Sequence, residues 1–369
     1  LTGLGPSVHS VMDGAARLPA RFPTMASLAK DGRVTTAMFS SNPTTFPAFG
    51  FNRSWDRYET ISPVSGITGR SIITDFAHWL ETRVKESKDE RILAVIHSKG
   101  VHPPWTATPE EVRQLPPEEY MGPIDGRRGG QVLQKARGKR ARVKLKPEDQ
   151  ERIRGYVRLS LAQDDKDLSQ VVEVLRKLGL WDSTLLVVTS DVGMGGATRV
   201  PFTDGDTLGE DLLELPMLIR FPAGRFGGTS VDVPTTPLDL LPTVSAAFGL
   251  GAGTEGGYDL FQVAARPARF APRMQLAVLG PSYSTRFGDL LLVGTSPKAP
   301  MLCDLMEPDS CSDSVKNRLP GFSEVLFRLT YSQQREAKSA NRNQAGREPA
   351  TIDPDTTAAL MVWGNQEVQ

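Results

Sequence analysis

Ile92-Leu93-Ala94-Val95-Ile96-His97 is a short run, apolar almost throughout, that lies between polar segments. Strands buried on both faces of a parallel sheet are apolar at successive positions, so this run predicts such a strand. Three further runs have the same character: Val34–Phe39, Leu185–Ser190 and Pro216–Phe221. We predict that these four strands lie parallel in one sheet.

Helical segments separate the predicted strands. Gly69–Lys88 has one apolar face, and Pro147–Leu178 begins with a proline and acidic residues and stops at Gly179. Pro237–Phe248 also begins at a proline and ends beside a glycine. The alternation of strands and helices predicts an α/β fold, a three-layer α/β/α sandwich with helices on both faces of a mostly parallel sheet.

The pattern changes toward the end of the chain. We expect residues 1–262 to form the α/β domain and residues 263–369 a smaller α+β domain with strands at Met274–Leu279 and Leu290–Gly294. Residues Gln333–Pro349 are strongly polar, and we expect them to form a mobile segment of the tail.

Bulk composition excludes some function classes. The chain has 43 basic and 43 acidic residues, so no overall field favours nucleic acid or an anionic membrane as a partner. No run is long and apolar enough to span a bilayer. The sequence opens at Leu1 without a methionine or a signal peptide, and we expect that a segment upstream is missing.

One segment has a local excess of positive charge, because Lys135, Arg137, Lys139, Arg140, Arg142, Lys144 and Lys146 follow one another without an acidic residue between them. A solvated loop before the long helix explains this pattern, and a strip that binds anions is the alternative. The two cysteines, Cys303 and Cys311, are either a small disulfide loop or two free thiols.

A series of short motifs resembles the sulfatase family in the family's own order, over nearly the whole chain. Leu1-Thr2-Gly3 is similar to the end of the family signature, whose Cys or Ser nucleophile would lie eight residues before Leu1. Other matching elements are Ile92–His97 with His102-Pro103-Pro104-Trp105, Tyr156 with Asp165, Ser190-Asp191-Val192-Gly193, Leu238–Thr243 and Leu302-Cys303-Asp304-Leu305.

The resemblance implies an alkaline-phosphatase-like fold in which a nucleophile on a divalent metal, usually calcium, attacks the sulfur of a sulfuric ester. Asp191 matches a metal ligand of the family, but Val192 stands where a second ligand belongs, and its isopropyl group has no lone pair. Calcium prefers six to eight oxygen ligands, so we expect this chain to bind no calcium tightly.

Two further residues are candidates for the anion site. The resemblance implies that His102 contacts the sulfate group, and a structural histidine in a proline-rich loop is the alternative. Arg199 is the only basic residue in Met194–Glu214 and could contact an anion, although its pKa is too high for proton transfer. Asp191 could also cap the turn after its strand. We predict that His102 and Asp191 share one cleft.

These features favour a hydrolase of small-molecule or glycan sulfate esters whose activity this chain, by itself, does not retain. One alternative is a non-catalytic pseudosulfatase that binds a sulfated or phosphorylated ligand. Another is a phosphoryl-transfer relative on the same fold. Because exported sulfatases meet oxidising conditions, we expect a periplasmic or extracellular location and predict a Cys303–Cys311 bond.

Overall fold

A computed structural model describes residues 1–9, 11, 16–62, 71–136, 142–194, 208–251, 256–279, 282–295, 300–307, 311, 319–342 and 348–363. The chain forms two compact units, and each is built from several segments. The parallel unit comprises Asp13–Thr184, Ala197–Asp204 and Glu348–Gln369. The antiparallel unit comprises Leu1–Met12, Leu185–Gly196 and Gly205–Arg347. Residue 262 does not divide these units, and the expected domain boundary there remains a prediction.

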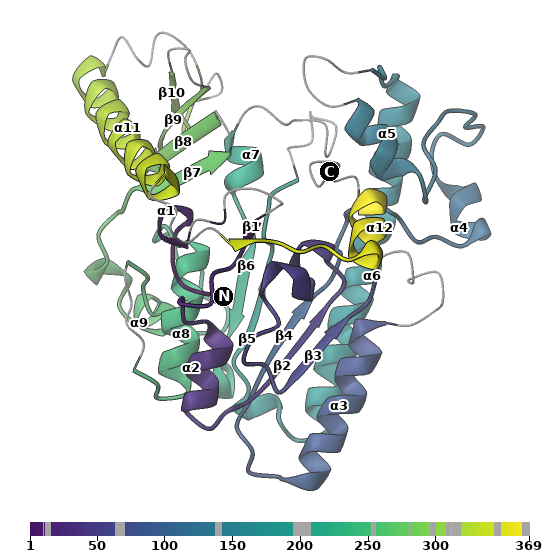
Figure 1. Ribbon diagram of the computed structural model, residues 1–369, viewed down its shortest axis with the longest axis vertical. Coiled ribbons are helices and arrows are strands. Elements are labelled where there is room, and N and C mark those ends of the chain that lie inside the picture. Colours follow the sequence, from purple (N-terminus) through teal and green to yellow (C-terminus); the bar gives the residue numbers. More distant parts are fainter. Residues whose placement is uncertain are drawn as a thin grey trace. The chain divides into compact units, whose positions relative to one another are not determined.

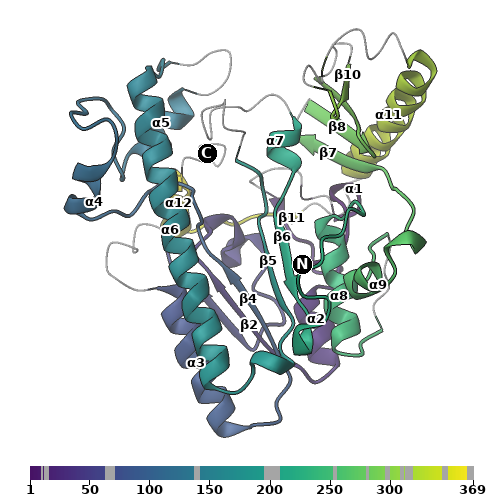
Figure 2. The ribbon, with the colours of Figure 1, turned by 180° about the vertical axis from the view of Figure 1, so that it is seen from behind.

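The parallel unit contains a three-stranded sheet of order β3-β2-β4, with β3 at Arg57–Thr60, β2 at Thr35–Ser40 and β4 at Ile92–His97. Both pairings are parallel, as predicted for β2 and β4. Helices α3 (Ile72–Glu86) and α6 (Pro147–Lys177) lie side by side against one face (Figures 1 and 2). The predicted helices therefore exist and cover the sheet.

Strand β2 is buried on both of its faces. Ala37 and Phe39 face the helices, in a cluster with Phe76 of α3 and Val174 of α6. Thr36, Met38 and Ser40 alternate with them and are also buried. On this second face, Ser40 Oγ forms a hydrogen bond of 2.7 Å with Thr45 Oγ1, so its buried hydroxyl has a partner. Burial on both faces explains why the strands show continuous apolar runs rather than alternation.

Helix α6 ends where the sequence indicates. Gly179 follows the helix with a φ of 71°, a left-handed conformation that favours glycine. Its N–H donates to the carbonyl of Arg176 at 3.0 Å, and the N–H of Leu180 donates to the carbonyl of Leu175 at 2.8 Å. These bonds satisfy carbonyls that the helix itself leaves without partners.

In the antiparallel unit, β5 (Leu186–Thr189) and β6 (Met217–Arg220) occupy the other two predicted strands. They pair antiparallel, as a separate two-stranded sheet, so the prediction of four parallel strands in one sheet is wrong. Apolar runs specify burial but not strand direction, which is set by the connection between the strands. Helices α8 (Leu240–Ala247) and α9 (Leu260–Ala265) follow these strands, and Phe221 packs with Leu260 and Val263.

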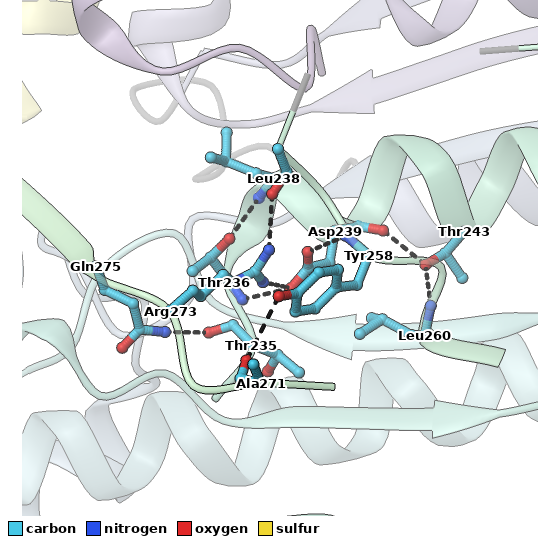
Figure 3. Close-up of polar contacts among 11 residues, drawn as sticks. Thr235, Thr236, Leu238, Asp239, Thr243, Tyr258, Leu260, Ala271, Arg273 and Gln275 are labelled. Carbon is cyan, nitrogen blue, oxygen red and sulfur yellow. Dashed lines mark hydrogen bonds and ion pairs between the residues drawn. The ribbon is translucent and has the colours of Figure 1, made fainter. Parts of the chain in front are cut away.

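A buried ion pair lies just before α8 (Figure 3). Asp239, which is 0% exposed, contacts Arg273 and accepts bonds from the N–H groups of Thr236 at 2.7 Å and Tyr258 at 2.6 Å. The Arg273 guanidinium lies 4.1 Å from the centroid of the Tyr258 ring and donates to the carbonyl of Gly256 at 2.8 Å. The network joins the start of α8 to the segment before β7.

An antiparallel sheet of order β10-β9-β8-β7 follows. Its strands are Gln275–Leu279, Ser282–Phe287, Leu290–Thr295 and Met301–Asp304 for β7 to β10. Helix α11 (Pro320–Arg342) packs on it through Leu326. Cys303 and Cys311 are bonded, which confirms the predicted disulfide.

The predicted mobile segment is in part helical, because residues 333–342 continue α11, and residues 348–349 form β11. Polar composition suggested disorder, but the packed first half of α11 supplies the helix nucleus, and Gln, Arg, Glu, Ala and Lys extend it readily.

The end of the chain returns to the parallel unit. Strand β11 (Glu348–Pro349) pairs antiparallel with β1 (Ala16–Arg17), and α12 (Pro354–Trp363) packs beside α5 (Gly129–Lys135). The other α-helices within the described residues are α1 (Pro6–His9), α2 (Met25–Asp31), α4 (Pro109–Gln114) and α7 (Glu210–Leu213). Within the described ranges, no helix is long and apolar enough to cross a membrane.

Candidate anion site

The segment Ser98–Trp105, which we call the β4 loop, leaves the carboxyl end of β4. Its first part is a tight turn in which the His102 N–H donates to the carbonyl of Lys99 at 3.2 Å. Gly100 has a φ of 56° in this turn. The turn therefore brings two basic side chains, those of Lys99 and His102, to the edge of a parallel sheet where α/β proteins place ligands.

Lys99 is partly buried in the loop. Its ammonium donates to the carbonyl of Pro104 at 2.6 Å and to Thr106 Oγ1 at 2.9 Å, and an ammonium has a third N–H to donate. Burial lowers the pKa of Lys99 to about 8, although the charge of Asp164 opposes this shift. Lys99 is therefore a cation whose usual hydration has been partly replaced by the protein.

Asp164 lies on α6, opposite the loop. Its carboxylate accepts from Ser98 Oγ at 3.4 Å, and Ser98 Oγ also accepts from the N–H of Gly100 at 3.2 Å. Burial raises the pKa of Asp164, and the nearby charge of Asp167 adds to this shift. Asp165, the residue matched by motif spacing, is exposed, so the neighbouring carboxylate is the one that faces the loop.

His102 is held within the loop and against the end of the chain. Its Nδ1 lies 2.6 Å from the carbonyl of Pro103, and its ring stacks on Trp363 of α12 with centroids 3.9 Å apart. The functional and structural alternatives for His102 are thus both compatible with its surroundings. Its position three residues after Lys99 favours a shared role.

Aromatic packing fixes the second half of the β4 loop. The Trp105 ring stacks on Tyr156 of α6 at a centroid distance of 4.9 Å, and its indole N–H donates to the carbonyl of Val101 at 2.8 Å. The Trp105 backbone N–H donates to the carbonyl of Gly126 at 2.7 Å. These contacts hold the end of the loop that follows Lys99 and His102 on α6.

Asp191 belongs to the antiparallel unit, directly after β5 and Ser190. It is exposed, Val192 beside it is 57% exposed, and Ser190 Oγ donates to the Val192 carbonyl at 2.7 Å. Because His102 lies in the other unit, the predicted common cleft remains a prediction. Arg199 and residues 137–141 of the basic strip lie outside the described residues.

The donor set of the described residues does not suit a metal ion. In the part of the chain that the structure describes, no three His, Cys, Asp or Glu side chains cluster so as to hold one. At the motif itself Asp191 is a single carboxylate beside a valine, whereas calcium prefers six to eight oxygen ligands. The described donors do not fit calcium.

The sequence prediction missed Lys99, Asp164 and Trp363. The position of Lys99 was a local signal, because a basic residue there comes two residues after the predicted strand and three residues before a candidate histidine. Asp164 was hidden by its neighbour Asp165, since only helix packing shows which of two adjacent carboxylates faces inward. Trp363 had no signal near His102 in the sequence.

Comparisons with known proteins agree on one family. A family model described as Sulfatase matches residues 1–250. An endo-4-O-sulfatase of Bacteroides thetaiotaomicron is 29% identical over 112 residues, which cover 30% of this chain and 22% of that protein. The matched stretch is thus about a fifth of that relative's length.

Two solved structures share the fold. The phosphonate monoester hydrolase of Agrobacterium radiobacter has a TM-score of 0.63 at 18% identity, covering 90% of this chain and 84% of that chain. A protein solved in complex with its substrate D-glucosamine-2-N,6-O-disulfate has a TM-score of 0.67 at 15% identity, covering 94% and 88%. These likenesses show the α/β fold with its parallel sheet.

Proposed function

Because the chain belongs to the sulfatase family, we propose that the β4 loop binds the anionic head of a sulfuric ester, with Lys99 and His102 as the cationic contacts. The observation that carries this proposal is the partly desolvated ammonium of Lys99 in the same turn as His102. A cation that has already lost part of its hydration gives up less on contact with an anion, and charge-assisted hydrogen bonds are stronger than neutral ones.

The proposed reaction of the whole protein is hydrolysis of a sulfuric ester on a small molecule or glycan. In that reaction, Lys99 and His102 would orient the ester and stabilise the charge that develops on its oxygens. Lys99 could donate its third N–H, and a protonated His102 could donate from Nε2. The sulfated sugar bound by one of the structural relatives is a suitable probe.

We further propose that this 369-residue chain binds the ester without hydrolysing it. Both of its cysteines are held in the Cys303–Cys311 bond, so neither is available as a nucleophile. The isopropyl side chain of Val192 offers no lone pair beside Asp191. The disulfide also supports the proposal of a periplasmic or extracellular location, since such bonds persist in oxidising compartments.

Calorimetric titration with D-glucosamine-2-N,6-O-disulfate tests the binding proposal. Lys99→Ala and His102→Ala should each weaken binding at least about tenfold, as expected for the loss of a charged hydrogen bond. Lys88→Ala, at an exposed lysine near the other end of β4, is the matched control and should bind like wild type. Unchanged affinity in both site variants would contradict the proposal, and tighter Lys99-dependent binding of phenylphosphonate would favour the phosphoryl-transfer alternative.

Turnover of an aryl sulfate with added calcium tests the second proposal. We expect no hydrolysis above that of buffer. Robust turnover that disappears in Asp191→Ala would show that these residues form a working metal site and would overturn the proposal.

A further inference from the structure

Trp363, from the last described turn of α12, lies flat on the ring of His102. The centroids are 3.9 Å apart and the planes differ by 6°. We propose that Trp363 is a positioning residue, which fixes the orientation and tautomer of His102. The effect on anion binding rests on the proposed function, whereas the effect on the His102 ring does not.

Two contacts of the His102 ring bear on its tautomer and orientation. Its Nδ1 lies 2.6 Å from the Pro103 carbonyl. A carbonyl oxygen only accepts, so Nδ1 must carry a proton and donate it. In the neutral ring this places the lone pair on Nε2, and in the imidazolium both nitrogens donate. Rotation about the bond to the ring is otherwise broad, and a flat partner such as Trp363 restricts it.

Helix α12, which carries Trp363, is itself anchored in the parallel unit. Ala359 and Leu360 of α12 are buried against Phe46 and Phe49. The helix is capped by Asp353, whose Oδ1 accepts from the N–H of Thr356 at 2.8 Å. Because α12 is anchored in this way, we expect the Trp363 side chain to keep its position against His102.

Close packing of α5 completes the arrangement. A Cβ added at Gly130 would lie 3.0 Å from the carbonyl oxygen of Val362, 3.4 Å from that of Trp363 and 3.5 Å from Pro103 Cγ. The absence of a side chain at Gly130 thus lets α12 and the β4 loop approach the same point on α5. The indole and the imidazole are brought together by this shared contact.

Nitrogen NMR of the histidine side chains tests the inference in the protein without ligand. The chain has four histidines, so His102→Gln assigns the signal. Wild type should show the Nδ1–H tautomer. Trp363→Leu keeps apolar volume without a flat ring and should give a mixture with the Nε2–H tautomer, whereas Trp363→Phe should keep the wild-type state. Met361→Ala, at an exposed residue of the same helix, is the control.

Titration of the same variants with the disulfated sugar measures the consequence. Trp363→Leu should bind about three- to tenfold more weakly, as expected for the loss of one aromatic pair, and Trp363→Phe should bind like wild type. An unchanged tautomer in folded Trp363→Leu would overturn the proposal, as would loss of folding in both variants, which would assign Trp363 a purely structural role. If wild type fails to bind the sugar while Trp363→Leu still shows the change of His102 tautomer, the proposed function is refuted and this inference stands.

Discussion

Two partly or fully buried charges in this protein have opposite surroundings. Asp239 in the antiparallel unit is enclosed by the Arg273 guanidinium and two backbone N–H groups (Figure 3). Lys99 in the parallel unit has a carbonyl and a hydroxyl as its hydrogen-bond partners, and its pKa falls to about 8.

The difference separates a structural charge from one suited to a ligand. At Asp239 the surrounding donors compensate the lost hydration, so the carboxylate holds together the segments that donate to it. At Lys99 the pKa falls although the charge of Asp164 opposes the shift, so the compensation is incomplete, and the anion of the proposed ester would add to it. Burial of a charge is therefore uninformative until its partners are known.

The largest expected effect is on the Asp239 network. Asp239→Ala leaves Arg273 without its anion and the N–H groups of Thr236 and Tyr258 without an acceptor, which should lower the free energy of unfolding by about 3–5 kcal/mol. Urea denaturation measures this. Asp232→Ala, at a nearby exposed aspartate, should change stability by less than about 0.5 kcal/mol.

The interpretation of Asp239 as a structural charge has its own test. Replacing Asp239 and Arg273 together by leucine and methionine should recover much of the loss, because no unpaired charge remains. If Asp239→Ala lowers the free energy of unfolding by less than about 1 kcal/mol, Asp239 does not have this structural role.

A steric change in α5, at a residue that packs against the β4 loop, should have a smaller effect. A Cβ at Gly129 would lie 2.3 Å from the Trp105 ring, so Gly129→Ala should destabilise the protein by about 1–3 kcal/mol and weaken ester binding. Gly321→Ala is the matched control, since a Cβ there meets nothing within 4 Å, and it should raise stability by up to about 1 kcal/mol. Equal behaviour of the two variants in thermal unfolding would show that the loop is not held as described.

The pH dependence of binding should identify the charge of Lys99. The ammonium is protonated below about pH 8, so the contribution of Lys99 to ester affinity, measured as the difference from Lys99→Ala, should be constant there and fall by up to about tenfold per pH unit above it. In Lys99→Arg the side chain stays charged, so the ester affinity of this variant should stay constant to higher pH. Parallel alkaline profiles of the two proteins in calorimetry would exclude Lys99 as the titrating contact.

The smallest expected effect is on stability. Burial lowers the pKa of folded Lys99 to about 8, against an unfolded value of 10.5, so between these values the unfolded chain binds more protons and stability should rise with pH. Lys99→Met lacks the titrating amine. Relative to this variant, the free energy of unfolding of wild type should rise by about 1 kcal/mol between pH 8 and pH 10.5, because solvent contact reduces the effect that the full pKa shift would have. Urea titrations of both proteins at pH 7 and pH 10 measure the difference, and an unchanged difference would mean that Lys99 is not desolvated.

The sequence by itself determined several of the elements and some of their ends. Apolar runs predicted β2, β4, β5 and β6, and the proline at the start and glycine after the end of α6 predicted its limits. The motif order identified the family, and the short spacing of the two cysteines, together with the oxidising conditions that the resemblance implies, predicted the Cys303–Cys311 bond. All of these signals are local, because periodicity, capping and loop length depend on residues that are neighbours in the chain.

Only the tertiary structure decided strand direction and the make-up of the site. Nothing in the runs of β5 and β6 encodes their antiparallel pairing. The choice of Asp164 over Asp165, the desolvation of Lys99 and the stack of Trp363 on His102 each depend on a surface supplied by a distant segment. Burial and stacking are properties of packed neighbours, and packing brings together residues whose separation along the chain carries no period that a sequence pattern could reveal.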